Sequence, residues 1–176
     1  IAWLGFESFS SSAALLILFL AFDYLISAKL FYYFRLYTTR VMCFDVNGVL
    51  VTGDFKKERL SPMPGIYELL DNLRQTHVLC VIGNNNELMA MGLHKNMGFD
   101  KYFDHPFQSS GFGTKKPDPA YFKMVGHRIG VNPKRMVFAD DLAENVDGAK
   151  KAGCDGFVFT TTEKYRKDLA TIGISA

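Results

Sequence analysis

From residue 40 onward, short apolar runs alternate with longer stretches whose apolar residues recur every three or four positions. The short runs fit strands buried on both faces, and the periodic stretches fit amphipathic helices. Strands that alternate with helices form a mostly parallel sheet covered by helices on both faces. We therefore predict an α/β fold of the Rossmann-like type, a three-layer sandwich around a central, mostly parallel sheet. The predicted strands are residues 40–45, 77–82, 103–108, 135–139 and 156–159.

Five stretches have the periodicity or the boundary residues of helices. Residues 64–75 carry apolar residues at i, i+3, i+4 and i+7, with a proline near the first turn. Asp118 is predicted to cap a helix that ends at Gly130, because an aspartate accepts hydrogen bonds from the free N–H groups of a first turn. Thr162 is predicted to cap the final helix in the same way. The remaining two helices are residues 87–96 and a helix that ends at Gly153.

Residues 1–40 differ from the rest of the chain in composition. They hold only five charged side chains, which are Glu7, Asp23, Lys29, Arg35 and Arg40. We therefore predict two parts, a hydrophobic helical segment at residues 1–39 and a folded domain at residues 40–176.

Residues 13–34 are long enough to cross a bilayer, which takes about 20 apolar residues. Insertion scales assign about −5 kcal/mol to the large apolar side chains and about +6 kcal/mol to Asp23 and Lys29 together. Because these values nearly cancel, a membrane anchor or membrane-surface helix stays open beside a packed helix, a partner helix or a mistranslated leader. If the segment inserts, Arg35 and Arg40 favour a cytoplasmic location for the domain that follows. We expect a cytoplasmic protein, membrane-associated through residues 13–34 in the first alternative.

The balance of charge excludes one class of function. With 20 basic and 18 acidic residues and a formal net charge of +2, the chain lacks the broad basic surface that nucleic-acid binding requires. The three cysteines, Cys43, Cys80 and Cys154, lie in or beside apolar runs, so we expect buried, reduced thiols of an intracellular protein.

Polar residues gather where the predicted strands end. Asp45 closes the first strand, residues 83–84 follow the second, and residues 140–141 follow the strand at 135–139. Lys116 lies in the loop before the helix capped by Asp118. Because the carboxyl ends of parallel strands share one edge of a sheet, we expect these residues to surround one site.

Four segments in this order carry the polar residues: F-D-V-N-G-V-L (44–50), V-I-G-N-N (81–85), K-K-P-D-P-A-Y-F (115–122) and F-A-D-D-L-A-E-N-V-D-G-A-K-K-A-G (138–153). Together they resemble the haloacid dehalogenase-like (HAD) hydrolase superfamily, nearest its phosphatase-like branch. The resemblance covers roughly residues 40–170 and leaves the first forty unexplained. One motif alone would be weak, whereas four in order, each on its expected element, are specific.

The resemblance implies catalytic roles for three residues. Asp45 would be the nucleophile that attacks phosphorus and forms an aspartyl-phosphate. Lys116 would neutralise the charge of the nucleophile and the phosphoryl group. Asn47 stands where phosphatases of this family usually have the aspartate that serves as general acid and base.

The resemblance also implies a Mg²⁺ site. Its ligands would be Asp45, Asp141 and the backbone carbonyl of Asn47, with Asp140 as a second acid and Asn145 where many members have another acid near the metal. Carboxylate, carbonyl and water ligands suit Mg²⁺ rather than zinc. A divalent cation would reduce the repulsion between a carboxylate nucleophile and an anionic phosphate ester.

Phosphate binding is expected from two loops. Backbone N–H groups of Val46, Asn47 and Gly48 can donate to phosphoryl oxygens. In the second motif, Gly83 replaces the usual serine or threonine and removes a hydroxyl donor, for which Asn84 would partly substitute.

Asn47 cannot exchange a proton, and the loss of a general acid–base typically costs about 10²- to 10⁴-fold in rate. An active enzyme would then favour substrates with good leaving groups, such as acyl or aryl phosphates. A catalytically impaired binding protein on the same fold stays open as an alternative. A haloacid dehalogenase is a further alternative, but its chemistry needs no metal, and the carboxylates of Asp140 and Asp141 would repel the nucleophile.

In the family that the chain resembles, substrate choice comes largely from a cap, which is an extra segment inserted after the first or second motif. The spacing of the motifs in this chain leaves no room for a large cap of this kind. Only thirteen residues separate Leu50 from Pro64, and the interval from Asn84 to Lys116 is filled by a predicted helix and strand. We therefore expect a capless domain with an open site, and a phosphorylated small molecule or a phosphoprotein as its substrate.

Overall fold

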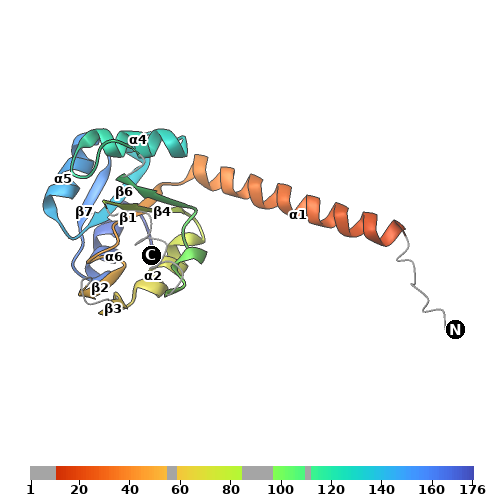
Figure 1. Ribbon diagram of the computed structural model, residues 1–176, viewed down its shortest axis with the longest axis horizontal. Coiled ribbons are helices and arrows are strands. Elements are labelled where there is room, and N and C mark those ends of the chain that lie inside the picture. The colour runs from red at the N-terminus through yellow and green to blue at the C-terminus, as the bar shows by residue number, and fades with distance from the viewer. Residues whose placement is uncertain (1–10, 55–58, 85–96, 110–111) are drawn as a thin grey trace. The chain divides into compact units, whose positions relative to one another are not determined.

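The computed structural model describes residues 11–54, 59–84, 97–109 and 112–176 (Figure 1). The chain forms two compact units, Ile1–Phe34 and Arg35–Ala176. Helix α1 (Ser11–Thr38) begins in the first unit and ends in the second, which contains all other elements. The division predicted from composition, between residues 39 and 40, stays a prediction.

The second unit is built on a five-stranded sheet in which all neighbouring strands are parallel. From one edge to the other, its strands are β5 (His105–Gln108), β4 (Val78–Gly83), β1 (Val41–Phe44), β6 (Met136–Asp140) and β7 (Asp155–Val158). The five predicted strands and the parallel sheet are confirmed, with strand ends that differ by a few residues.

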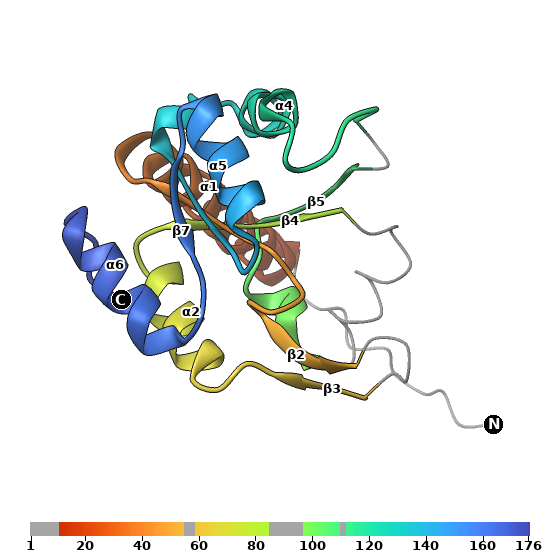
Figure 2. The ribbon, with the colours of Figure 1, turned by 90° about the vertical axis from the view of Figure 1, so that its left-hand side faces the viewer.

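Helices cover both faces of this sheet (Figure 2). On one face lie α2 (Ile66–Arg74) and α6 (Thr162–Thr171), and on the other lie α4 (Pro119–Ile129) and α5 (Ala143–Ala152). Short 3₁₀ helices occupy Phe99–Lys101 and Pro133–Arg135. The predicted three-layer sandwich is therefore confirmed.

Burial on both faces explains why the central strands are uninterrupted apolar runs. All four residues of β1 are buried. Met42 and Phe44 belong to the core cluster that also contains the apolar residues of α2 and α6. Val41 and Cys43 alternate with them and lie on the opposite face of the strand. Each large side chain buried in this way contributes about 1.5–3 kcal/mol.

The strand order brings three loops together. Strand β1 lies between β4 and β6, and Phe44 is in register with Val81 on one side and Ala139 on the other. The N–H of Asp45 then donates to the carbonyl of Ala139 at 2.9 Å. The residues that follow these three strands consequently share one edge of the sheet, the carboxyl-end rim.

The segment that leads into β1 is fixed at the opposite, amino-end rim. The Arg35 guanidinium donates to the carbonyls of Arg74 (2.6 Å) and His77 (3.0 Å), just before β4. The Arg135 guanidinium donates to the carbonyls of Leu36 and Thr39. These bonds lie within the second unit and hold its first residues against the strand starts.

Two features differ from the expectations. Strands β2 (Val51–Asp54) and β3 (Arg59–Pro62) form an antiparallel pair that was not predicted. The predicted Thr162 cap of the final helix is wrong: the Thr161 hydroxyl accepts from the N–H of Lys164 at 3.1 Å, whereas the Thr162 hydroxyl donates to the carbonyl of Pro64. The helix predicted at residues 87–96 lies outside the described residues.

The remaining boundary predictions are confirmed. Asp118 caps α4 by accepting from the N–H of Ala120 at 2.8 Å, and Gly130 ends that helix with φ +83°. Gly153 ends α5 with φ +101°. The three cysteines are buried, as expected from their apolar neighbours.

Candidate active site

Asp45 stands at the centre of the carboxyl-end rim, directly after β1. The loop that follows folds back on itself, because the N–H groups of Leu50 and Val51 both donate to the carbonyl of Val46 at 3.0 Å. Gly48 adopts φ +79°, a backbone conformation that residues with a side chain rarely take. These backbone bonds fix the loop that follows Asp45.

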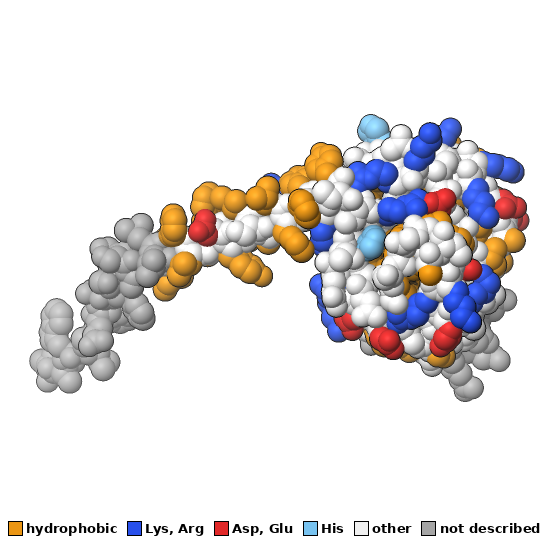
Figure 3. Space-filling view, turned by 180° about the vertical axis from the view of Figure 1, so that it is seen from behind, with side chains coloured by type: hydrophobic (Ala, Val, Ile, Leu, Met, Phe, Trp, Pro, Cys, Tyr) orange, Lys and Arg blue, Asp and Glu red, His pale blue; other side chains and the backbone are white. Residues whose placement is uncertain are grey.

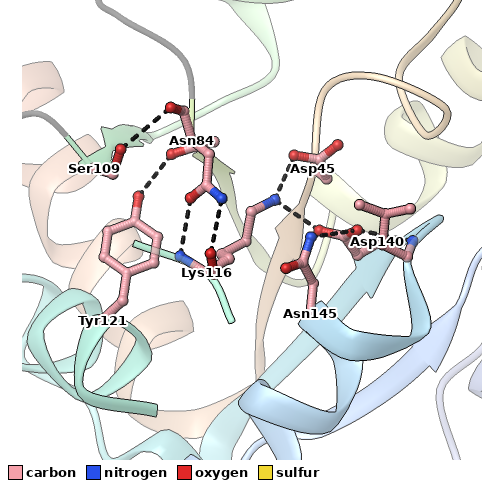
Figure 4. Close-up of polar contacts among 9 residues, drawn as sticks. Asp45, Asn84, Ser109, Lys116, Tyr121, Asp140 and Asn145 are labelled. Atoms are coloured by element: carbon pink, nitrogen blue, oxygen red, sulfur yellow. Dashed lines mark hydrogen bonds and ion pairs between the residues drawn. The ribbon is translucent and has the colours of Figure 1, made fainter. Parts of the chain in front are cut away.

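Lys116 joins two of the carboxylates at this rim (Figure 4). Its Nζ lies 2.5 Å from Oδ1 of Asp45 and 2.6 Å from Oδ2 of Asp140. Only 3% of Lys116 is exposed, and its ammonium also lies 5.2 Å from the centre of the Phe138 ring. A buried ammonium needs such partners, since an unpaired buried charge is strongly destabilising.

The backbone of Lys116 is held by Asn84, which follows β4. The Lys116 N–H donates to Oδ1 of Asn84 at 2.9 Å, and Nδ2 of Asn84 donates to the Lys116 carbonyl at 2.9 Å. Nearby, the Tyr121 hydroxyl donates to the carbonyl of Gly83 at 3.0 Å. Figure 4 shows that these contacts tie the loop after β4 to the segment that carries the lysine.

The two acids after β6 have different surroundings. Asp140 is completely buried, and its Oδ1 accepts from the Leu142 N–H and from Nδ2 of Asn145, both at 3.0 Å. Asp141 is exposed and lies against Gly48, where an added Cβ would come within 2.4 Å of its Oδ2. Glycine at position 48 therefore allows Asp141 to approach the loop after β1.

Asp45, Asp140 and Asp141 form an acidic cluster. One carboxylate oxygen from each lies within 4.8 Å of the others. Opposite ligands of a Mg²⁺ ion are separated by about 4.2 Å, because each bond measures about 2.1 Å. In the described part of the chain, one ammonium lies among these three carboxylates, so both the oxygen donors and the excess of negative charge fit a divalent cation.

The pKa values of the acids reflect this crowding. Burial raises the pKa of Asp45, the Lys116 ammonium opposes that rise, and the charge of Asp140 adds to it. Burial and then the charge of Asp140 raise the pKa of Asp141. Positive charge at this rim would therefore stabilise the ionised carboxylates.

The structure brings most of the predicted site residues together. It also shows which of the groups expected to bind phosphate already have hydrogen-bond partners within the protein. The N–H of Gly48 donates to the carbonyl of Val51 at 2.8 Å, so it is already engaged. In the described part of the chain, the N–H of Asn47 has no such acceptor, and its residue is exposed. Both polar groups of the Asn84 amide are engaged with the Lys116 backbone, and its expected phosphate contact stays a prediction.

Sequence reasoning missed Gly148, because a glycine within a helical pattern gives no sign of what lies opposite. A Cβ at this position of α5 would lie 1.9 Å from the carbonyl oxygen of Pro117, the residue after Lys116. The absence of a side chain therefore lets α5 pack directly against the lysine loop.

We expect Gly148→Ala to lower the free energy of unfolding by about 1–3 kcal/mol, because the new methyl group overpacks this contact. In an open helix position the same change normally stabilises by about 1 kcal/mol, so the sign is diagnostic. Urea unfolding measures the change, with the exposed neighbour Asp147→Ala as the control, expected within about 0.5 kcal/mol of wild type. A Gly148→Ala variant as stable as the wild type would contradict the contact.

Comparison with known proteins agrees with this geometry. Residues 55–153, more than half of the chain, match the haloacid dehalogenase-like hydrolase family. A parallel sheet with an aspartate, a lysine and an acidic pair at its carboxyl-end rim defines the class of protein, and the chain belongs to the haloacid dehalogenase-like hydrolases.

Three relatives are similar to parts of the chain. Flavin mononucleotide hydrolase 1 of Arabidopsis thaliana is 29% identical over 133 residues, which is 75% of this chain and 53% of the relative. The (S)-2-haloacid dehalogenase 4A of Burkholderia cepacia is 28% identical over 54% of this chain and 42% of its own length. A phosphoglycolate phosphatase of Neisseria meningitidis is 33% identical over 43% of this chain and 32% of its own. The chain thus spans about half or less of the length of these relatives.

A solved structure supports the fold. An aspartate-to-alanine mutant of a HAD family enzyme from Bacteroides thetaiotaomicron, in complex with magnesium and inorganic phosphate, superposes with a TM-score of 0.60 at 19% identity. The match covers 68% of this chain and 93% of that one.

Proposed function

We propose that this hydrolase is a Mg²⁺-dependent phosphatase that works through an aspartyl-phosphate on Asp45. The observation that carries the proposal is the double contact of the Lys116 ammonium with Asp45 and Asp140 beside a third carboxylate, Asp141. Relatives that are named as phosphatases, and a neighbour in complex with magnesium and phosphate, support the same chemistry.

In the proposed reaction the Asp45 carboxylate attacks phosphorus, and the bond from phosphorus to the ester oxygen breaks. The departing alkoxide takes a proton from water. A second water then attacks phosphorus and gives a proton to the hydroxide left by the first, the bond between phosphorus and the Asp45 oxygen breaks, and inorganic phosphate leaves with the carboxylate restored. The Lys116 ammonium offsets the negative charge of both partners.

The residues suited to hold Mg²⁺ are Asp45, Asp141 and the carbonyl of Asn47, with Asp140 as the second acid. When bound, the cation would supply positive charge between the nucleophile and the phosphoryl group. We propose that Asn145 acts here through Asp140, to which its amide donates, and that it keeps that carboxylate oriented. The N–H of Asn47 is the proposed backbone donor to the phosphoryl oxygens, while Val46 and Gly48 shape the loop.

Because Asn47 cannot protonate a leaving group, we expect Asn47→Asp to raise turnover of alkyl phosphates by about 10²-fold or more. Aryl phosphates leave readily without a proton, so they should gain less. Steady-state phosphate release from one alkyl and one aryl substrate measures the two gains. Equal gains, or none, would contradict the role assigned to this position.

Phosphoryl transfer is preferred over two competing functions. A haloacid dehalogenase needs no cation, and the acidic pair beside Asp45 would then repel the nucleophile. A binding protein without catalysis is favoured by Asn47 and Gly83. We propose that the glycine at position 83 leaves an active but slow enzyme. The Tyr121 hydroxyl holds the loop there by donating to the carbonyl of Gly83.

Beryllium fluoride, which mimics a phosphoryl group on aspartate, tests the proposal. With Mg²⁺ present, we expect one fluoride complex per chain by ¹⁹F NMR, and none after EDTA or in Asp45→Asn. A panel of acyl, aryl and alkyl phosphates with and without Mg²⁺ tests turnover. If the wild type takes up no complex, catalysis is contradicted, and halide release from a 2-haloacid in EDTA would point to dehalogenation instead.

We propose that the site is capless and open to its substrate. Strands β2 and β3 occupy part of the short interval after the first motif. Such a site would accept a phosphorylated small molecule or a phosphoprotein. We propose that the hydrolase domain acts in the cytoplasm.

A further inference from the structure

Helix α1 is apolar on every side. In the described part of the chain, one helix, Ile17–Thr38, is long and apolar enough to cross a membrane, with a mean hydropathy of 1.5. Successive residues of an α-helix point about 100° apart, so Ile17, Leu18, Phe19 and Leu20 together cover the full circle. Figure 3 shows hydrophobic side chains along both visible edges of this helix.

This distribution decides what can cover the helix. Apart from the half-buried Tyr32, the large apolar side chains from Ile17 to Phe34 are between 42% and 74% exposed. A helix that is hydrophobic on all sides is either buried in the core of a large protein or crosses a membrane, whereas a helix on a protein surface has a single apolar stripe. A helix that lies on a membrane surface likewise needs a polar side. The described residues of this chain bury none of the most apolar part of Ile17–Thr38, so the hydrocarbon of a bilayer is the environment that fits this helix.

Length and flanking residues fit the same occupant. Residues 13–34 span about 33 Å as a helix, against a hydrocarbon thickness of about 30 Å. Tyr32 and Tyr33 lie near the end of this stretch, where aromatic rings favour the membrane–water interface. Arg35 begins the folded unit, and its guanidinium is bound there to the carbonyls of Arg74 and His77.

We propose that residues 13–34 cross a lipid bilayer once and anchor the hydrolase domain on the cytoplasmic side. Arg35 and Arg40 follow the span directly and favour this orientation. Free buried cysteines in the domain agree with a reducing compartment. Within the folded unit, the rim that carries Asp45 is opposite the rim that binds Arg35.

The two charges inside the span, Asp23 and Lys29, oppose insertion and supply a sharp test. The long stem of a lysine can carry its ammonium toward the interface, whereas a short aspartate cannot reach it. Removal of the charge in Asp23→Leu should therefore increase membrane retention.

The full chain is made in the presence of vesicles of phosphatidylcholine and phosphatidylglycerol, and extracted with alkaline carbonate. We expect the wild type in the pellet, and at least a tenfold lower pellet-to-supernatant ratio for the double variant Leu25→Arg, Ile26→Arg. The matched control Leu25→Phe, Ile26→Leu should behave as wild type. Thermal unfolding of each variant shows whether the domain stays folded.

Trypsin added to sealed vesicles should digest the domain but leave the bond after Lys29 intact until detergent is added. Cleavage after Lys29 in sealed vesicles would indicate a surface helix and overturn the proposal. A wild type released by carbonate, or a mature chain from cells that lacks residues 13–34, would overturn it as well. Phosphatase activity is not the readout, so the outcome is independent of the proposed function.

Discussion

Asp45→Asn is expected to abolish phosphate release, with a fall of about 10⁴-fold or more in the turnover number. An amide is not a nucleophile toward phosphorus, and loss of a covalent nucleophile removes most of the catalysis that depends on it. The side chain keeps its shape, so substrate binding should change little. Turnover of the best phosphate ester from the panel, with Mg²⁺ in excess, gives the measurement.

The stability of this variant separates a catalytic role from a structural one. Burial and Asp140 raise the pKa of Asp45, which means that the fold disfavours its charged form. Asp45→Asn should therefore unfold within about 1 kcal/mol of the wild type. The exposed Asp100→Asn serves as control and should retain full activity. If Asp45→Asn keeps a tenth of the activity, the aspartyl-phosphate route is wrong.

Lys116→Met is expected to reduce both activity and stability. The ammonium lies within 2.6 Å of oxygens from Asp45 and Asp140, and its side chain is 2% exposed. Removal of one member of a buried charge group leaves the others uncompensated, which destabilises by about 3–5 kcal/mol. The loss of positive charge beside the phosphoryl group should lower turnover by about 10²- to 10³-fold. Chemical unfolding and phosphate release measure the two effects.

The neighbouring lysine provides a matched control. Lys115 is exposed, so Lys115→Met should change stability by less than about 0.5 kcal/mol and leave turnover intact. Mg²⁺ should restore part of the stability of Lys116→Met, because a cation at the acidic cluster also offsets the uncompensated charge. A Lys116→Met protein as stable as the wild type would mean that the ammonium does not hold the carboxylates together.

The regular elements of the fold were largely predictable from local patterns. Uninterrupted apolar runs marked the central strands, since β1 and β6 are buried along their whole length. The 3–4 periodicity marked α2, whose four apolar residues are all buried. The β2–β3 pair was missed because V-T-G-D and R-L-S-P have neither pattern, and only pairing with each other makes them strands.

Within the site, residue identities were predictable but contacts were not. The motifs located Asp45, Lys116 and Asp140, yet the lysine is 71 residues from the first and 24 from the second. The hydrogen bonds between the Asn84 amide and the Lys116 backbone join two loops that are far apart in the sequence. No local sequence pattern predicts that these loops come into contact.

The sequence by itself determined the alternation of strands and helices, the acidic and basic residues at the strand ends, and the substitution of Asn47 for an acid. These follow from burial periodicity and from the identity of single residues, which are local properties. Only the tertiary structure decided which oxygens the Lys116 ammonium joins and why residues 48 and 148 are glycines. Those outcomes depend on which segments the strand order brings into contact, and a distance between segments far apart in the chain is set by packing rather than by either segment alone.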